Sequence, residues 1–308
     1  MLSRLRIIIS ITLIAVAFYL VSTEAFLAVL RRINVLFIGL SIMLFYCQVL
    51  VVSWRFQIVL RLGGVRIGFV PALEATALSV VAGAVLFSPV VGMVLRVLVL
   101  RHADCPVRTL VLATLFERVV LLTVLVVAAL VSILWLRVDV TWIEAWSNVY
   151  WIIATGALLV AITWFFAYRF GYIERMRREW SQTMADIHSY VSNISGIIVV
   201  TLVTVASHIV FLAAAIAAAY ANHIDLGIYD LSAAISATML LASIPVAISG
   251  WGVREISLIW LLGHLGIDGS TALAFSIVVG VLSLLAAALA SAMSLVIAIL
   301  RRRDEAAI

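Results

Sequence analysis

The feature that most constrains this chain is a series of long apolar stretches that carry almost no charge. Six of them reach the roughly 20 residues that an α-helix needs to cross the hydrocarbon core of a bilayer. Because 66% of the 308 residues are hydrophobic and only 11% are charged, a soluble domain is excluded. We expect an all-α polytopic membrane protein in which residues 1–308 form one integral membrane domain. The predicted spans are Ile7–Leu27, Ile33–Ser53, Leu110–Leu136, Val149–Tyr168, Ile194–Tyr220 and Ala272–Leu300.

Two further apolar segments, Phe69–Leu100 and Leu231–Leu265, are each too short for two spans and are interrupted by proline and glycine. We predict that both are re-entrant helical hairpins, which a membrane protein tolerates only where protein or a watery cavity covers the freed backbone groups. Matching broken helices in two halves of a chain are typical of a transport site near the bilayer midplane. The matching residues are Glu74, Pro89, Gly92 and Arg96 in the first half of the chain and Asp230, Pro245, Gly250 and Arg254 in the second.

The arginines predict the orientation of the chain, which contains no lysine. With the N-terminus inside, 14 arginines fall in cytoplasmic segments and three, Arg31, Arg32 and Arg137, fall in outer loops. This bias favours both termini inside. Counting the broken segments as full spans would place the Arg169–Arg178 cluster outside, so hairpins are preferred. Each half then has three spans and one hairpin, which predicts an inverted repeat with halves of approximately 1–137 and 138–308.

Arg254 and Glu255 follow the turn-forming residues Gly250 and Gly252 at the predicted start of a helix. A helix N-terminus attracts anions, and a guanidinium group binds phosphate through two hydrogen bonds. The functional hypothesis is a phosphate site; the structural alternative is that the two charged residues only cap and brace the hairpin.

Glu117 and Arg118 lie within a predicted span, where a charge needs a partner. They could neutralise each other, or Glu117 could pair with Arg96 or Arg254. Such a pair either fixes the helix register or contacts substrate. Arg96 could instead extend to the interface. His208 is a candidate proton relay, with an interhelical hydrogen bond as the alternative.

The sequence contains no motif for catalysis, nucleotide binding or metal binding. There is no Walker A loop, nucleophile elbow or metal-ligand spacing, and Cys47 and Cys105 do not indicate a disulfide framework. We therefore expect no enzyme activity, no cofactor and no metal. The basic character belongs to loops that meet lipid headgroups, so a nucleic-acid partner is not expected.

Four motifs together resemble the flippase-like integral membrane domain of lysylphosphatidylglycerol synthases. They are Trp54-Arg55, Ser88-Pro89-x-x-Gly92-x-x-x-Arg96, Phe116-Glu117-Arg118 and Pro245-x-x-x-x-Gly250-x-Gly252-Val253-Arg254-Glu255. The family often carries an acid shortly after its Glu-Arg pair, whereas this chain has Leu121 and Leu122. The resemblance implies movement of a lipid with a charged or sugar-phosphate headgroup between leaflets, without aminoacyl transfer.

The leading hypothesis is a lipid translocase of the inner membrane that binds an anionic or polyprenyl-phosphate lipid. The headgroup would lie between the hairpin tips, held by Arg254, Arg96 and the N-terminus of the second helix of that hairpin. The alternatives are a membrane-embedded lipid-linked transferase and a non-transporting partner of a lipid synthase. A homo-oligomer or a separate synthase partner is compatible with the chain.

Overall fold

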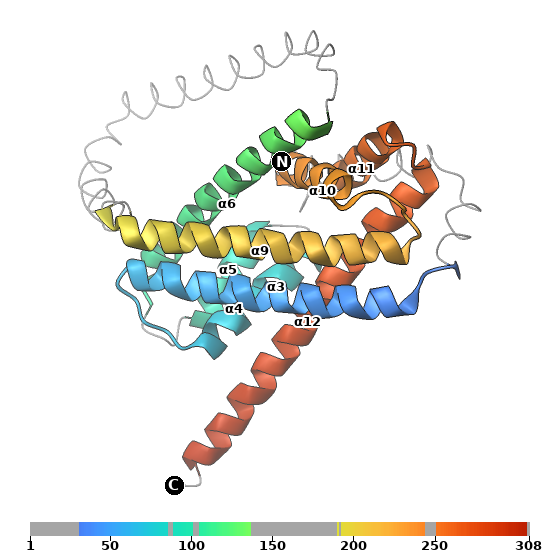
Figure 1. The fold of residues 1–308 in the computed structure, drawn as a ribbon. Coiled ribbons are helices and arrows are strands. Elements are labelled where there is room, and N and C mark those ends of the chain that lie inside the picture. The colour runs from blue at the N-terminus through green and yellow to red at the C-terminus, as the bar shows by residue number, and fades with distance from the viewer. Residues whose placement is uncertain are drawn as a thin grey trace, which may run out of the picture. The chain divides into compact units, whose positions relative to one another are not determined.

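The computed structural model of the protein describes residues 31–85, 89–100, 105–136, 192–243 and 251–306, together with Tyr190. These residues form α-helices joined by short connections, without strands, which confirms the all-α class. The chain divides into two compact units, one of Met1–Leu136 with Ser195–Ile308 and one of Arg137–Ile194. The helices, labelled in Figure 1, are α3 (Val35–Leu62), α4 (Phe69–Val85), α5 (Pro89–Leu100), α6 (Val107–Leu136), α9 (Ile194–Ala221), α10 (Ile228–Ser243), α11 (Val253–His264) and α12 (Gly269–Ala306).

Four helices of the described part of the chain, α3, α6, α9 and α12, are long and apolar enough to cross a membrane. They coincide with four of the six predicted spans. The other two predictions, Ile7–Leu27 and Val149–Tyr168, lie outside the described residues. The predicted end of the second span at Ser53 is wrong, because α3 continues without a break to Leu62.

The two interrupted segments each form two short helices, as the prolines and glycines predicted. The first holds α4 with 17 residues and α5 with 12. The second holds α10 with 16 residues and α11 with 12. A 12-residue helix rises about 18 Å, well short of the roughly 30 Å of a hydrocarbon core. In each segment the two helices pack against one another; their re-entry from one membrane face stays a prediction.

The ends of several helices are specified by local sequence. Asn34 accepts a hydrogen bond from the backbone nitrogen of Leu36 at 3.0 Å and so caps the start of α3. Gly252 has a φ of 88°, a left-handed conformation that glycine adopts without steric cost, and it directly precedes α11. Asp268 accepts hydrogen bonds from the backbone nitrogens of Ser270 and Thr271, both at 3.0 Å, and caps α12.

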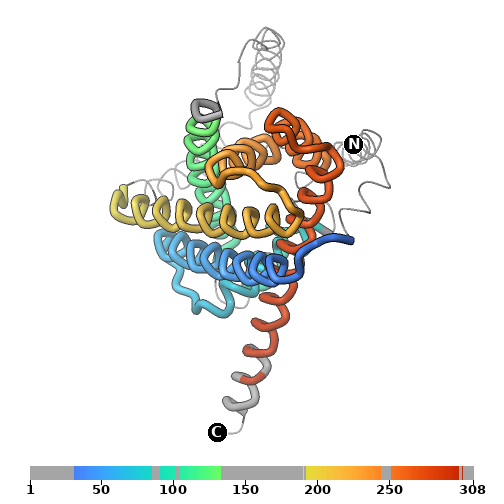
Figure 2. Tube along the Cα trace, turned by 45° about the vertical axis from the view of Figure 1, so that its right-hand side comes forward, coloured from blue at the N-terminus to red at the C-terminus, as the bar shows by residue number. Residues whose placement is uncertain are grey.

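Helices α3 and α9 lie side by side in opposite directions, as both views show (Figures 1 and 2). The hydroxyl of Ser41 donates to the carbonyl oxygen of Ala214 at 2.8 Å, and the backbone nitrogen of Asn34 donates to that of Ala221 at 3.0 Å. The second half of α9 is rich in buried alanines. Small residues let helices approach closely where lipid offers no hydrophobic driving force.

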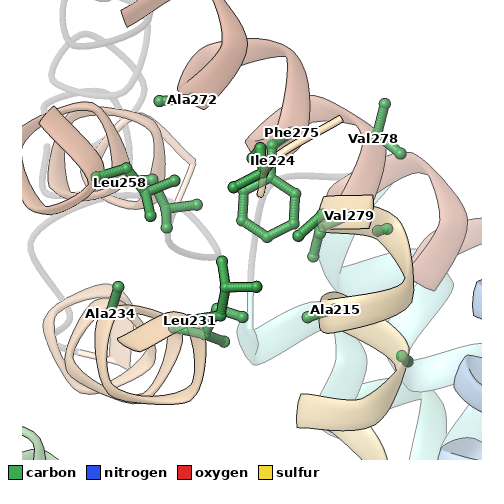
Figure 3. Packing of buried hydrophobic residues seen from close by; sticks show 14 of the residues in the cluster. Ala215, Ile224, Leu231, Ala234, Leu258, Ala272, Phe275, Val278 and Val279 are labelled. Carbon is green, nitrogen blue, oxygen red and sulfur yellow. The ribbon is translucent and has the colours of Figure 1, made fainter. Parts of the chain in front are cut away.

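The main apolar core joins α9 to α10, α11 and α12. Phe275 of α12 lies at its centre, 1% exposed, with Leu231 of α10 and Leu258 of α11 nearby (Figure 3). Short helices α10 and α11 are therefore held by packing on long helices.

The first helix of each short pair also packs against a long helix of the opposite half. Helix α4 contacts α12, and α10 contacts α6. These reciprocal contacts hold both short pairs among the long helices, and they place charged residues of α5 and α11 inside the helical assembly.

Candidate functional site

The first charged site is the Glu117 cluster, which we define as Glu117, Arg55, Arg96, Ser79 and Thr204. Glu117 is 4% exposed and lies on α6. Its Oε1 accepts from Nε of Arg55 at 3.1 Å, and its Oε2 accepts from Nη1 of Arg96 at 2.9 Å. One carboxylate therefore joins three helices, α3, α5 and α6.

Arg55 corrects an expectation from the sequence. Its position after Ser53 predicts a cytoplasmic segment beyond the span, but Arg55 lies inside α3 and is 5% exposed. Its Nη1 also donates to the hydroxyl of Thr204 on α9 at 3.5 Å. The Trp54-Arg55 motif and the charge of Arg55 predict the end of the span. In the fold Arg55 contributes charge to the interior.

Arg96 lies where α5 meets α4 and α6. Its Nε donates to the hydroxyl of Ser79 on α4 at 3.2 Å, and its guanidinium carbon lies 4.4 Å above the ring centroid of Phe56. Gly92, one turn earlier on α5, faces the same neighbour: a Cβ atom added there would meet the carbonyl oxygen of Ser79 at 2.6 Å. Gly92 thus allows the close approach of α4 and α5 that brings Arg96 to Glu117.

The predicted pairing of Glu117 with Arg96 is confirmed, and the other three possibilities are not. Arg118 is exposed on α6, and among the described residues the salt bridges of Glu117 go to Arg55 and Arg96 instead. Arg254 bonds to Glu255 instead. Arg96 does not extend to the interface, because its side chain is 12% exposed and holds a buried ion pair.

The Glu117 cluster carries more positive than negative charge. In the described part of the chain, the salt bridges of Arg55 and Arg96 both come from Glu117. Two guanidinium groups and one carboxylate leave a formal charge of +1. A charge in an apolar helical interior is costly unless it is paired, so this arrangement favours an additional anion.

The second charged site is the Glu255 cluster, which we define as Arg254, Glu255, Ser276 and Gly252. Glu255 is 2% exposed, and its Oε2 accepts from the backbone nitrogen of Gly252 at 2.6 Å. Its Oε1 accepts from Nη2 of Arg254 at 2.6 Å and from the hydroxyl of Ser276 at 3.0 Å. Glu255 therefore completes the cap of α11 and pairs with Arg254, so the capping and bracing contacts are both present and the pair has no excess charge. Phosphate binding by Arg254 stays a prediction.

Arg254 is held in a closely fitted position. Its Nε donates to the hydroxyl of Ser276 at 3.1 Å, and its guanidinium carbon lies 4.6 Å above the ring of Trp251. A Cβ atom added to Gly280 on α12 would come within 2.5 Å of Nη2 of Arg254. These contacts fix the orientation of the guanidinium plane of Arg254. A lysine at this position would keep the charge but would lack the planar pair of N–H donors.

Other predicted residues have mixed outcomes. Pro89 begins α5, while Ser88, Pro245 and Gly250 lie outside the described residues. Nε2 of His208 lies 3.1 Å from the hydroxyl of Ser236, so the interhelical hydrogen bond between α9 and α10 is confirmed. Within the described ranges, no group of three or more His, Cys, Asp or Glu residues is arranged to hold a metal ion.

Comparison with known proteins identifies the family. The family model described as the lysylphosphatidylglycerol synthase TM region matches residues 4–291. No curated protein and no solved structure matches the chain. The matched range contains both charged clusters and all four long helices up to residue 291. The chain therefore belongs to the family of lysylphosphatidylglycerol synthase transmembrane regions.

Proposed function

We propose that this protein is a lipid translocase that moves a phosphate-bearing or glycosylated lipid between the leaflets of the inner membrane, without changing the lipid chemically. The observation that carries the proposal is the excess positive charge of the Glu117 cluster. A buried cluster that lacks one negative charge is suited to a ligand that brings one.

A lipid phosphate fits this requirement better than a neutral headgroup does. Arg55 and Arg96 are both delocalised guanidinium groups, which bind phosphate oxygens through paired hydrogen bonds. Glu117 holds them on one side and limits the excess to a single charge. One phosphate monoanion would balance that charge, and the acyl or prenyl tails would stay in the bilayer.

The arrangement of the short helices supports transport. Two pairs of short helices, α4 with α5 and α10 with α11, each present one interior arginine. Each pair packs through its first helix on the last long helix of the other half. Reciprocal packing of this kind suits an inverted repeat whose halves rock against each other around a fixed site.

The two clusters would have different parts in this cycle. The Glu117 cluster would bind the phosphate, because it has the unbalanced charge. Arg254 is already paired with Glu255 and stacked on Trp251, so it would contact the headgroup while remaining braced. The sequence has no Walker A loop, so the cycle would draw on a gradient or on consumption of the lipid.

Reconstitution into vesicles tests the proposal. Head-labelled fluorescent phosphatidic acid and a head-labelled neutral diacylglycerol derivative are added to the vesicles, and translocation is followed as loss of signal to a membrane-impermeant quencher. Wild-type protein should move the anionic probe faster than the neutral one, and Arg96→Lys should lower the anionic rate at least about tenfold, equivalent to about 1.4 kcal/mol.

Two other outcomes would contradict a translocase. Turnover of a polyprenyl-phosphate-linked sugar donor without lipid movement would indicate a lipid-linked transferase. Neither movement nor turnover for anionic, aminoacylated or polyprenyl lipids would indicate a non-transporting partner of a synthase. Gly39→Ala is the control variant for the translocation assay, and it should move the anionic probe at the wild-type rate. A Cβ atom added at Gly39 meets nothing within 4 Å.

A further inference from the structure

A third polar site lies away from both charged clusters, where helices α3 and α12 begin and helix α9 ends. A cavity of about 400 Å³ opens there, within the range of about 300–1,000 Å³ typical of small-molecule sites. Its lining includes Arg32, Asn222, His223, Asp268 and Thr271. Four of these residues come from three separate connections of the chain, and Thr271 lies in the first turn of α12. The sequence motifs discussed above include none of them.

Asn222 supplies the first sign of a ligand. The residue is 2% exposed, and its Nδ2 donates to the carbonyl oxygen of Ala218 at 2.7 Å. Its Oδ1 is buried and has no hydrogen-bond partner among the described residues. A buried acceptor without a donor costs about 1–3 kcal/mol. The site therefore favours a ligand that brings an N–H or O–H group.

His223 supplies the second sign. Its φ is 58°, the left-handed region that non-glycine residues rarely adopt. Its Nε2 donates to the carbonyl oxygen of Arg32 at 2.7 Å, which ties the end of α9 to the start of α3. Strained conformations of this kind are held by surrounding structure and cluster at ligand sites. In the neutral ring Nδ1 is a further acceptor.

The charges around the cavity balance. Burial alone would raise the pKa of Asp268, but hydrogen bonds from Thr271 and Ser270 outweigh it and hold the pKa below its usual value. Asp268 is therefore a carboxylate at neutral pH, opposite in charge to Arg32. A phosphate group would be attracted by Arg32 and repelled by Asp268. An ammonium group would be attracted by Asp268 and repelled by Arg32.

We propose that this cavity binds a polyol, such as the sugar or glycerol portion of a lipid headgroup. A hydroxyl both donates and accepts. It can donate to Oδ1 of Asn222 and to the Asp268 carboxylate, and it can accept from the guanidinium of Arg32. A neutral group with several hydroxyls satisfies this mixed lining without adding charge. The polyol site itself is inferred from the residues that line the cavity. Only the assignment of the polyol to a lipid headgroup rests on the proposed function.

Native mass spectrometry of the full chain in a detergent without sugar groups tests the site. The probes are glucosyl diacylglycerol, phosphatidic acid, a diacyl lipid with a trimethylammonium headgroup, and free methyl glucoside. Arg32→Gln removes the guanidinium and keeps the backbone carbonyl that His223 binds. Arg31→Gln is the matched control, because Arg31 is the neighbouring arginine and does not line the cavity.

Wild type and Arg31→Gln should bind glucosyl diacylglycerol at least about tenfold more tightly than Arg32→Gln does, whereas binding of the two other lipids should not depend on Arg32. If methyl glucoside at equal concentration displaces glucosyl diacylglycerol, the polyol site is supported and its ligand is a free sugar. Equal binding of glucosyl diacylglycerol by Arg31→Gln and Arg32→Gln, or no binding at all, would overturn the inference.

A second variant guards against a purely structural effect of Arg32. Asn222→Leu keeps the size of the side chain and removes the unpaired acceptor. It should lower affinity for glucosyl diacylglycerol, and the melting temperature should rise on adding that lipid to wild type but not to Asn222→Leu. An equal rise in both would contradict the site. Because binding is measured without vesicles, this result is separate from success or failure of translocation.

Discussion

Replacing Glu117 with glutamine should strongly destabilise the protein, because it removes the only carboxylate that bonds to Arg55 and Arg96 within the described residues. Glutamine keeps the shape of the side chain and can still accept a hydrogen bond. The formal charge of the Glu117 cluster, however, rises from +1 to +2. The perturbation is therefore electrostatic rather than steric.

The burial of the three side chains sets the magnitude. Their relative exposures are 6% for Arg55, 12% for Arg96 and 4% for Glu117. Removing one partner of a buried pair costs about 3–5 kcal/mol, whereas replacing a whole buried ion pair or triad by apolar groups is often neutral or stabilising by about 1–4 kcal/mol. Glu117→Gln should lose about 3–5 kcal/mol of unfolding free energy.

A set of combined variants, unfolded by SDS titration in bicelles, separates the partners. Adding Arg55→Met or Arg96→Met to Glu117→Gln should each recover part of the loss, since each returns the formal charge to +1. The triple variant should approach wild-type stability. Adding Arg254→Met should recover nothing, because Arg254 pairs with Glu255.

A stable Glu117→Gln protein would contradict this prediction, as would equal recovery from Arg254→Met and Arg96→Met. Either result would mean that the carboxylate is not the counter-charge of the two arginines. The Glu117 cluster would then not be an anion site.

Three further predictions concern other parts of the chain. Arg254→Lys should lower translocation while leaving expression and monodispersity near normal, because lysine keeps the charge and loses the planar fork; normal translocation would make the residue only a brace. Gly92→Ala should lower unfolding free energy by about 1–3 kcal/mol through overpacking, and Gly39→Ala should not. Asp225 and His264 are both exposed. In a variant with both native cysteines replaced, Asp225→Cys and His264→Cys should each react with a membrane-impermeant thiol reagent added from outside. Labelling only from the cytoplasmic side would exclude the inverted repeat.

Much of the fold could be predicted from the sequence, because hydropathy reports helix length directly. The apolar stretches predict the central parts of α6, α9 and α12, and proline and glycine predict both interruptions. The end of α3 was not predicted. Arg55 and Arg61 predict a cytoplasmic segment after the span, since charge normally ends a span. The helix continues because Glu117 and Thr204 satisfy the Arg55 side chain.

The charged sites can be predicted only in part. A charged residue within an apolar span indicates that it has a partner, but the sequence does not identify that partner. Glu117 and Arg96 were paired from sequence as one of several possibilities. Arg55 was missed because its partner lies 62 positions away on another helix. Gly280 leaves room for the guanidinium of Arg254, and Asn222 lines the cavity. Both features depend on packing between residues far apart in the sequence, so no local sequence pattern predicts them.

The most direct test of the central claim measures translocation by a stable protein without the cluster charges. Once the triple variant Arg55→Met, Arg96→Met and Glu117→Gln is shown to be folded, it is reconstituted beside wild type, and movement of head-labelled phosphatidic acid is followed. The triple variant should lose movement of this anionic lipid while keeping near wild-type stability. Movement at the wild-type rate would show that the Glu117 cluster is structural and that the headgroup is recognised elsewhere.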